Sequence, residues 1–379
     1  MAQAPRQARE ASKTGAVGAS AAVGASAASA ASGASGAAPR ISVVMPVFGV
    51  EDALRACLDS VLTQSFAEIE VIAVDDHSRD RSGEILDEYA ARDPRVRAIH
   101  LDRSGGPGRA RNTGLDQASG DYVWFVDADD VLAGESLAAI GAQLARADPD
   151  VLLIGFARLQ PSGAAEPNAW RHLLREQEPG QVFTLAERPE VIRLTMTAWS
   201  KVIRRAFLTG LGLRFEPGTH EDVPLTCLLL LNAKRIATLE TVCYLYRERR
   251  PGTLTNTPSD NNFQVFARYE QVFGVIDAHR AEFGQFRRVV FDRAIWHYTT
   301  VFEAPRAVPR SSRRAFFHLM SEHFTRFRPA SYVYPPGLRG LKYRLVERDA
   351  YRVYLAIQPL NKARVAAAKL LRRRPAAAS

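Results

Sequence analysis

Short apolar runs alternate with longer segments in which apolar residues recur every three or four positions. The runs are rich in Val and Ile and end at polar turns, a pattern that predicts buried β-strands. They cover 41–45, 70–74, 96–101, 122–126 and 151–156. The intervening segments place their apolar residues on one helical face. Strands that alternate with helices of this length predict an α/β fold whose central sheet is mostly parallel and flanked by helices.

This alternation stops after Ala157. Residues 160–182 are polar and contain several Pro and Gly, which predicts a long loop. A mixed segment runs from 185 to 246, and mostly helical sequence follows from 262. Apolar and aromatic residues at helical spacing between Phe286 and Val301 predict a C-terminal helical subdomain that packs against the sheet.

Composition indicates the compartment and excludes a membrane span. With 379 residues, 46% of them apolar, the chain can bury a large domain and an appendage. No apolar run is long enough to cross a bilayer. The three cysteines, Cys57, Cys227 and Cys243, are far apart and match no zinc-binding spacing. We therefore expect buried, reduced thiols and a cytoplasmic protein.

The net charge of +9 is concentrated at the two ends of the chain. Residues 1–40 carry four Lys or Arg against one Glu, and residues 362–379 carry six against no acidic residue. The part between them is therefore near neutral as a whole. This disfavours nucleic-acid binding, because a neutral body offers no broad track for phosphates.

The two ends predict different behaviour. Residues 1–40 are mostly Ala, Ser and Gly and lack the bulky apolar residues that offset chain entropy, so we expect a disordered tail. Their composition also resembles an organelle transit peptide, but without the amphipathic pattern. Residues 361–374 predict a basic amphipathic helix that either contacts an anionic membrane surface or ends as a solvated helix.

An acidic turn follows the predicted strand 122–126. Asp127, Ala128, Asp129 and Asp130 place three carboxylates beside a packed sheet, where they repel one another and lose hydration. A divalent cation such as Mg²⁺ or Mn²⁺ relieves both costs, because hard ions bind carboxylate oxygens. The alternative is an acidic turn that ends the strand and caps the next helix.

Polar groups also stand at the ends of the first two predicted strands. Pro46, Val47 and Phe48 follow the first strand, and Asp75 and Asp76 follow the second. Ligands of open α/β sheets bind at these carboxyl ends of the strands. A carboxylate at this place can accept a hydrogen bond from a base N–H or a ribose hydroxyl.

A Gly- and Arg-bearing segment lies between these strands and the acidic turn. Gly108, Arg109, Ala110, Arg111 and Asn112 open a predicted helix, whose backbone N–H groups and arginines favour phosphate oxygens. In combination with the strand ends, this segment predicts a pocket for a nucleoside diphosphate and a metal ion.

Four segments in this order resemble the motifs of family 2 glycosyltransferases, which have the GT-A fold. They are Ser42–Phe48, Val74–Asp80, Gly108–Gly114 and Phe125–Asp130. The resemblance implies transfer of a sugar from a nucleotide-sugar donor with inversion at the anomeric carbon, assisted by Mg²⁺ or Mn²⁺. It covers residues 41–250.

The resemblance also implies roles for individual residues. Pro46, Asp75 and Asp76 would line the nucleoside site, and Asp127 and Asp129 would form the DxD pair, with Asp129 nearest the metal. Further donor contacts would come from Val47, Phe48, Arg109, Arg111, Asn112 and Ala128. His77 stands where the family most often has Gly, so the backbone of this turn and its contact with the base can differ.

A second carboxylate motif follows in the other half of the chain. Thr219–Pro224 looks like the Glu-Asp motif of these enzymes. This implies that Asp222 takes the proton of the acceptor hydroxyl, while Glu221 orients that hydroxyl or the acceptor. Which of the two is the base stays open. In-line displacement requires one base on the face opposite to the leaving diphosphate. The alternative is that Glu221 and Asp222 cap the helix through Leu231.

Weaker candidates for contacts with the acceptor or the diphosphate are Trp199, Lys201, His220 and Arg247. For Arg249 and Arg250, a solvated basic edge after a strand is the alternative.

We therefore expect three parts. Residues 1–40 form the tail. Residues 41–250 form the GT-A domain, with a nucleotide-sugar half (41–157) and an acceptor half (158–250). Residues 251–379 form the helical region with its basic end.

The second half looks most like bacterial transferases that build cell-surface polymers. That implies a glycan, polyol-phosphate or lipid-linked acceptor, and a cytoplasmic enzyme that contacts the membrane peripherally through its basic end.

Two other classes of function compete with this one. A sugar-nucleotide pyrophosphorylase on a similar sheet would need a Gly-rich, Arg- or Lys-bearing signature directly after the first strand, which Pro46–Glu51 lacks. A noncatalytic scaffold that binds nucleotides or membranes would not release nucleoside diphosphate in the presence of metal. The donor sugar, the base and the linkage are not specified by the sequence.

Overall fold

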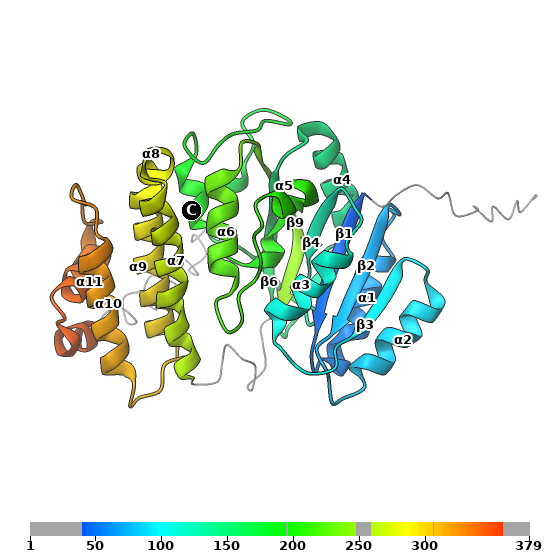
Figure 1. The fold of residues 1–379 in the computed structure, drawn as a ribbon, viewed down its shortest axis with the longest axis horizontal. Helices are drawn as coiled ribbons and strands as arrows, with labels where there is room; N and C mark the ends of the chain where they lie inside the picture. Colours follow the sequence, from blue (N-terminus) through cyan, green and yellow to red (C-terminus); the bar gives the residue numbers. More distant parts are fainter. Residues whose placement is uncertain (1–39, 195, 248–258, 306, 359–379) are drawn as a thin grey trace, which may run out of the picture. The chain divides into compact units, whose positions relative to one another are not determined.

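All five strands predicted in the first half are present in the computed structural model, which describes residues 40–194, 196–247, 259–305 and 307–358. The strands of this half are β1 (Ile41–Val47), β2 (Ile69–Asp75), β3 (Val96–His100), β4 (Tyr122–Phe125), β5 (Val131–Leu132) and β6 (Val151–Leu159). Its helices are α1 (Glu51–Leu62), α2 (Ser82–Arg92), α3 (Pro107–Gln117) and α4 (Ser136–Ala147) (Figure 1). The expected N-terminal tail, Arg249, Arg250 and the basic segment 361–374 lie outside the described residues.

The second half contains short strands, then helices. The strands are β7 (Ala165–Pro167), β8 (Lys201–Arg204) and β9 (Ile236–Arg247). The α-helices are α5 (Arg205–Gly210), α6 (Asp222–Asn232), α7 (Gln264–Ala278), α8 (Arg280–Phe283), α9 (Arg287–Glu303), α10 (Arg313–Phe327) and α11 (Gly337–Glu347). The 3-10 helices are η1 (Arg171–Leu174), η2 (Pro189–Arg193), η3 (Ala198–Ser200), η4 (Asp260–Phe263) and η5 (Gly284–Phe286).

The sheet brings the predicted motifs to one edge. Its strand order is β3-β2-β1-β4-β8-β6-β9-β5, and β7 pairs with β6. The first four strands in this order are parallel, with Val47 opposite Asp75 and Val44 opposite Phe125. Their carboxyl ends therefore meet. Beyond β4 the sheet is mixed, because β8 is antiparallel to both β4 and β6. The α/β class is confirmed, and the parallel pairing is concentrated in the nucleotide-sugar half.

Both faces of the sheet are covered. Alternate residues of β1 belong to different apolar clusters: Val43 and Met45 pack with residues of α1 and α4, whereas Val44 packs on the opposite side. This is the period of two that a strand buried on both faces requires. The three cysteines are buried free thiols, as expected.

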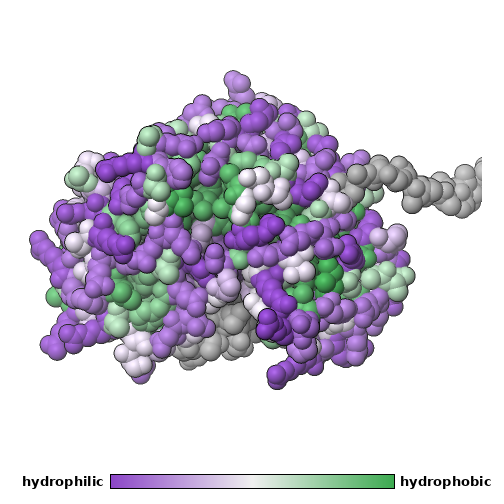
Figure 2. All heavy atoms as spheres, viewed as in Figure 1, coloured by the Kyte–Doolittle hydropathy of each residue, from purple (hydrophilic) through white to green (hydrophobic). Residues whose placement is uncertain are grey.

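The C-terminal helices share a core with the sheet, as predicted. Phe125 of β4 and Phe291 of α9 belong to the same apolar cluster, and α6 packs against α7. We call residues 259–358 the helical region. In the described part of the chain, no helix is both long and apolar enough to cross a membrane. The face seen in Figure 2 is mostly hydrophilic over these helices, with green confined to small areas.

The near-neutral body of the chain consists of two oppositely charged parts. Residues 41–258 carry 24 Lys or Arg against 31 Asp or Glu, a net of −7. Residues 259–361 carry 16 against 9, a net of +7. The expectation of neutrality thus holds only as a sum, and the argument that it made against phosphate binding does not apply to the helical region.

Candidate active site

The acidic turn after β4 gathers three carboxylates. Asp127, Asp129 and Asp130 each bring an oxygen within 4.8 Å of the others. Tyr244 of β9 fixes the turn: its hydroxyl accepts from the Asp127 backbone N–H (3.1 Å) and donates to the Asp130 carboxylate (2.7 Å). β5, which follows the turn, pairs with β9. A strand more than a hundred residues further along the chain therefore holds the acidic turn in place.

The chemistry of the acidic turn fits a divalent cation. Asp130 has no exposed surface and also accepts from the Arg247 backbone N–H (2.8 Å). Burial, followed by the charges of Asp127 and Asp129, raises the pKa of Asp130 to about 8. Full ionisation of the cluster is therefore costly at neutral pH, and a cation would offset that cost. Carboxylate oxygens without a thiol or imidazole suit Mg²⁺ or Mn²⁺.

The capping alternative for the acidic turn finds no support. The next helix, α4, begins at Ser136, beyond β5. Its N-cap residue is Glu135, which makes no side-chain capping hydrogen bond. The three aspartates thus belong to the strand end and not to a helix start.

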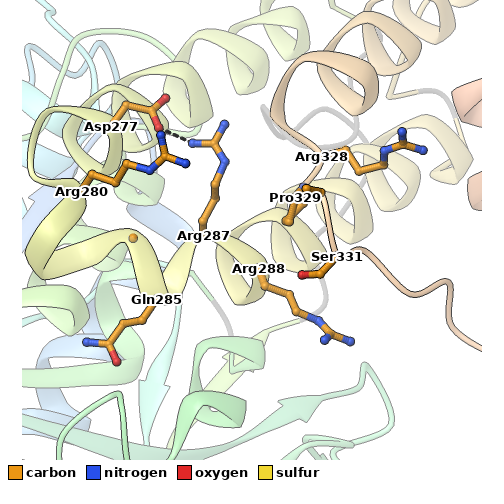
Figure 3. Close-up of a pocket in the computed structure, with 10 residues that line it drawn as sticks. Asp277, Arg280, Gln285, Arg287, Arg288, Arg328, Pro329 and Ser331 are labelled. Carbon is orange, nitrogen blue, oxygen red and sulfur yellow. Dashed lines mark hydrogen bonds and ion pairs between the residues drawn. The ribbon is translucent and has the colours of Figure 1, made fainter.

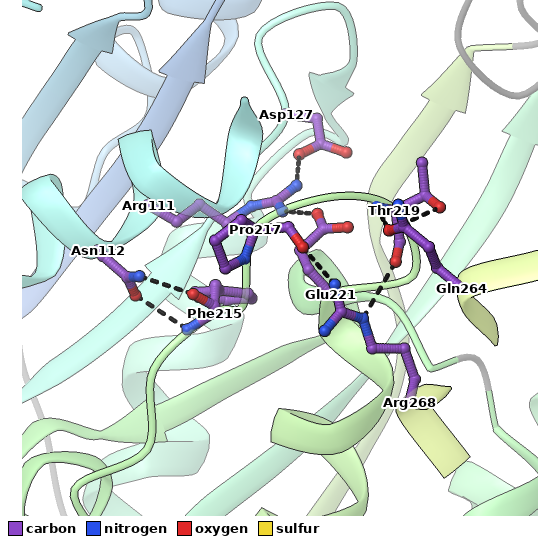
Figure 4. Close-up of polar contacts among 9 residues, drawn as sticks. All are labelled: Arg111, Asn112, Asp127, Phe215, Pro217, Thr219, Glu221, Gln264 and Arg268. Carbon is purple, nitrogen blue, oxygen red and sulfur yellow. Dashed lines mark hydrogen bonds and ion pairs between the residues drawn. The ribbon is translucent and has the colours of Figure 1, made fainter. Parts of the chain in front are cut away.

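Arg111 joins the acidic turn to the second carboxylate motif. Its buried guanidinium donates to Asp127 Oδ1 (2.8 Å) and to Glu221 Oε1 (2.6 Å) (Figure 4). Burial opposes its charge, but the carboxylates of Asp127 and Glu221 outweigh that effect and raise the pKa of Arg111. We call this pair of contacts the Arg111 bridge. Glu221 occupies the N-cap position of α6 without a side-chain capping bond, so its carboxylate serves the bridge and not the helix.

Asp222 lies beside the bridge as the first residue of α6. Burial, and then the negative charge of Glu221, raise the pKa of Asp222 to about 7 against the positive charges of Arg111 and Lys201. Lys201 is buried and donates to Ser200 Oγ (3.0 Å), and burial lowers its pKa. A carboxyl group with a pKa near neutrality can take a proton at physiological pH.

The loop 215–221, which we call the base loop, is held from two sides (Figure 4). From α3, the Asn112 side chain donates to the Phe215 carbonyl (2.9 Å) and accepts from the Phe215 N–H (3.0 Å). From α7, Arg268 donates to the carbonyls of Pro217 and Thr219. The position of the second carboxylate motif therefore depends on the helical region.

Two glycines permit these close contacts. Gly218 has a φ of +104°, and a Cβ there would lie 2.1 Å from Gln264 Oε1, which accepts from the Thr219 N–H (2.8 Å). At Gly108, in the first turn of α3, a Cβ would lie 2.9 Å from the Glu216 carbonyl oxygen. Any side chain at these positions would push the base loop away from α7 or α3.

The two acids after β2 are engaged by the chain itself. Asp76 accepts from Ser104 Oγ (2.7 Å) and from the backbone N–H groups of Gly105 and Gly106 (2.8 Å each). These contacts fix the start of α3. Asp75 accepts from the Ser78 N–H (3.0 Å) and lies 3.3 Å from His100 Nδ1. A contact with the nucleoside has to use the remaining acceptor capacity of these carboxylates, and it stays a prediction.

His77 and Phe48 shape the rest of this edge. His77 has a φ of +64°, a left-handed conformation that favours glycine. The turn thus has the backbone conformation that a Gly would adopt, and His77 is strained in it. Of the residues that end β1, Val47 is buried and Pro46 is partly buried, whereas Phe48 is 56% exposed.

Trp199 and His220 lie within the packing around the site. Trp199 is 5% exposed and stacks on Tyr244, with 4.5 Å between ring centroids and 4° between planes, so it supports the residue that fixes the acidic turn. His220 Nε2 lies 3.1 Å from Asn262 Oδ1, which links the base loop to η4. Contacts of either residue with a substrate stay predictions.

Arg109 points to a different surface from Arg111. It donates to the Arg103 carbonyl (2.8 Å) and pairs with Asp102 (3.1 Å). With Asn112, Phe215 and Pro217 it lines a cavity of about 530 Å³ between α3 and the base loop. Residues two apart do not share a helix face, so only Arg111 of this pair turns toward the carboxylates.

This arrangement is that of a GT-A-type transferase, and the comparisons with known proteins agree. The family model described as Glycosyl transferase family 2 matches residues 42–209. "Glycosyltransferase GlyG" of Streptococcus pneumoniae is 30% identical over 234 residues, which cover 58% of this chain and 74% of that protein. The chain belongs to glycosyltransferase family 2.

In two other relatives, the match covers a smaller share of the protein. "Uncharacterized glycosyltransferase EpsJ" of Bacillus subtilis is 32% identical over 228 residues, 58% of this chain and 64% of EpsJ. "Poly(ribitol-phosphate) beta-N-acetylglucosaminyltransferase TarS" of Staphylococcus aureus is 32% identical over 218 residues, 56% of this chain and 36% of TarS. The chain thus spans less than two thirds of these two proteins.

A solved structure shares the fold. The crystal structure of S. aureus TarS 1–349 with UDP-GlcNAc matches with a TM-score of 0.66 and 22% identity, over 86% of this chain and 92% of that one. At this identity the likeness concerns the fold alone.

Proposed function

We propose that this protein is an inverting glycosyltransferase that moves a sugar from a nucleotide-diphosphate sugar to an acceptor hydroxyl in the synthesis of a cell-surface glycan. The Arg111 bridge carries this proposal, because one guanidinium joins Asp127, in the metal-type cluster, to Glu221, beside the candidate base. Membership of glycosyltransferase family 2 supports the reaction class and disfavours a pyrophosphorylase.

The donor is held at the strand ends. Phe48 offers an exposed ring on which a base can stack, and Asp76 fixes the helix start that presents Arg111. Asp127 and Asp129 would hold a divalent cation, with Asp130 and Tyr244 behind them. When bound, this ion neutralises charge on the departing diphosphate.

Asp222 is the better base of the two candidates. The Glu221 carboxylate is already engaged by the Arg111 guanidinium at 2.6 Å, whereas the pKa of Asp222 is raised to about 7. In the proposed step, the acceptor oxygen bonds to the anomeric carbon, its proton passes to Asp222, and the bond from that carbon to the diphosphate oxygen breaks. Attack and departure on opposite faces invert the configuration.

The names of relatives support chemical classes for both substrates. TarS is named a poly(ribitol-phosphate) N-acetylglucosaminyltransferase, and its structure was determined with UDP-GlcNAc. We propose a nucleoside-diphosphate sugar as donor and a polyol-phosphate or related glycan as acceptor. We also propose a cytoplasmic location, which the buried free thiols support. Peripheral membrane contact through residues 361–374 remains part of the proposal.

The test is metal-dependent release of nucleoside diphosphate from a panel of nucleotide sugars. We expect release by the wild type only with Mg²⁺ or Mn²⁺, stimulated by a polyol-phosphate acceptor. Asp129→Ala should lose metal-stimulated release, and Asp222→Asn should lose about 100-fold or more of the transfer rate. Asp116→Asn, an exposed carboxylate of α3, is the control and should behave as wild type. A noncatalytic scaffold would bind the donors and release nothing with any metal, and that result would refute the proposal.

A further inference from the structure

A cavity lined by four arginines lies in the helical region, on elements that carry none of the candidate catalytic carboxylates. It has a volume of about 540 Å³, within the range of roughly 300–1,000 Å³ that small-molecule sites occupy. Arg280 of α8, Arg287 and Arg288 of α9, and Arg328 after α10 line it (Figure 3). We call it the arginine pocket. Among the residues that the structure describes, Asp277 is the one acidic residue that lines it.

Two of the arginines are held in place by the chain. Arg287 pairs with Asp277 and packs against the Phe273 ring, with 5.5 Å from its Cζ to the ring centroid. Arg328 pairs with Glu347 of α11. These contacts restrict the motion of two of the four arginine side chains before any ligand arrives, which lowers the entropy cost of binding.

The other two arginines add positive charge to the pocket without an ion pair in the described part of the chain. Among the described residues, neither Arg280 nor Arg288 forms an ion pair with a carboxylate, although the charge of Arg288 acts on Asp292. Arg287 and Arg288 are also the first two residues of α9, whose first turn contains no acidic residue. The N-terminus of a helix carries partial positive charge, so cations there are unfavourable unless an anion is present. In the pocket, the arginines therefore repel one another and the positive end of α9. Their N–H groups are also donors suited to phosphate oxygens.

The lining favours a phosphate on a soluble chain over a membrane surface. Gln285 and Ser331 add neutral hydrogen-bonding groups, and the described residues that line the cavity include no large apolar side chain. A site for a lipid surface would combine basic residues with apolar ones that insert between lipids. The net charge of +7 in residues 259–361 further favours a polyanion on this part of the protein.

The pocket is connected to the base loop through α7. Arg268, which binds the base loop, and Asp277, which lines the pocket, lie nine residues apart in this helix, or about 14 Å along its axis. Nine residues are about two and a half turns, so the two side chains leave α7 on opposite faces, and a ligand that reaches both sites has to pass around the helix. A polymer of several repeat units can extend over such a distance, whereas a single phosphate ion cannot.

We propose that the arginine pocket binds a phosphodiester group of the acceptor chain, so that the helical region holds the polymer while one of its hydroxyls reaches the base loop. The identity of the polymer as the acceptor rests on the proposed function. Binding of a phosphodiester to the pocket does not depend on it. The pocket would then select acceptors that contain phosphate over neutral glycans.

The test measures binding of a short synthetic polyol-phosphate oligomer to the full chain without donor. The pocket variant is Arg280→Gln with Arg288→Gln, because these two side chains make no ion pair with any described residue, so their loss should not disturb the fold. The control is Arg310→Gln with Arg314→Gln, which removes the same charge at the opposite end of α10. We expect the pocket variant to bind the oligomer about tenfold more weakly or worse, a change of 1.4 kcal/mol, and the control to bind as wild type.

Each other outcome overturns the assignment. Equal weakening in both double variants would indicate general charge attraction. Pocket-dependent binding of inorganic phosphate but not of the oligomer would indicate a site for a free anion. Pocket-dependent binding to vesicles of anionic lipid, with oligomer binding unchanged, would indicate a membrane contact. Because donor is absent, oligomer binding remains measurable even if the protein releases no nucleoside diphosphate, so the two proposals fail separately.

Discussion

The donor side and the acceptor side of this site are built in different ways. On the donor side, the acidic turn after β4 and the acids after β2 stand at the ends of two strands that flank β1 and run parallel to it, so the register of the sheet places them at one edge. On the acceptor side, Asp222 follows a loop that is positioned by side chains of α3 and α7. The first arrangement depends on backbone pairing and the second on a few polar contacts, so single substitutions should affect the two sides unequally.

The largest effect is expected where the two sides meet. Arg111→Gln removes the Arg111 bridge and leaves the partly buried Asp127 and the buried Glu221 without their shared partner. Removing one member of a buried ion pair costs about 3–5 kcal/mol of the free energy of unfolding. Because the base loop also loses its link to the acidic turn, we expect the transfer rate to fall about 100-fold or more. Denaturant unfolding and steady-state kinetics check both values.

Arg109→Gln is the matched control for stability. Arg109 is in the same helix and pairs with the exposed Asp102, so its loss should cost less than about 1 kcal/mol. Equal destabilisation by the two variants would show that Arg111 does no more than a surface arginine.

The next effect tests whether the helical region positions the base. Arg268→Gln removes donors to two carbonyls of the base loop, which should cost about 1–3 kcal/mol. Since the donor side is untouched, we expect the transfer rate to fall while the affinity for nucleoside diphosphate stays at the wild-type value. The control, Arg326→Gln, breaks the exposed pair with Glu270 in the same region and should change stability by about 0.5 kcal/mol or less. A fall in nucleotide affinity in the Arg268 variant would mean that the two sides are not separable.

A pH profile distinguishes the proposed base from the metal cluster. The raised pKa of Asp222, about 7, means that the ionised base is lost as the pH falls through neutrality. At saturating metal, we therefore expect kcat/KM to fall about tenfold per pH unit below that value and to level off above it. Asp222→Asn should abolish this limb. A wild-type profile that stays flat down to pH 5 would contradict the assignment.

The smallest effect concerns backbone strain on the donor side. His77→Gly relieves a left-handed conformation that costs a side chain about 1–2 kcal/mol, partly offset by the greater entropy of Gly in the unfolded chain. We expect a gain of up to about 1 kcal/mol in the free energy of unfolding. A loss of stability would show that the imidazole makes a favourable contact, and the KM for the donor would then show whether that contact involves the nucleotide.

The sequence was most informative where chemistry and secondary structure coincide. The five apolar runs predicted β1 to β4 and β6 but not the two-residue β5, and the acids at their ends predicted that Asp75, Asp76 and Asp127 would share an edge. Strand ends meet whenever the pairing is parallel, so this part needs no knowledge of distant contacts. The role of Tyr244 could not be predicted, because its hydrogen bonds to the acidic turn depend on the pairing of β5 with β9.

The acceptor side was less predictable for the same physical reason. The Glu221-Asp222 pair could be recognised as a motif, but nothing in the local pattern indicates that Arg268 binds backbone carbonyls of the base loop. The antiparallel insertion of β8 between β4 and β6 was likewise hidden, since a short apolar run does not specify its partners. The near-neutral charge of the body was misleading, because two parts of opposite charge cancel.

The contacts of α7 with the base loop have a consequence for how such a chain can be taken apart. The family model ends at residue 209, Asp222 follows that boundary, and the side chain that positions its loop comes only at residue 268. An exchange of sugar preference between relatives could be attempted by swapping the segment up to β4 as a cassette. An exchange of acceptor specificity would have to include α7, since Asp222 would not be positioned correctly without the helix that supports its loop.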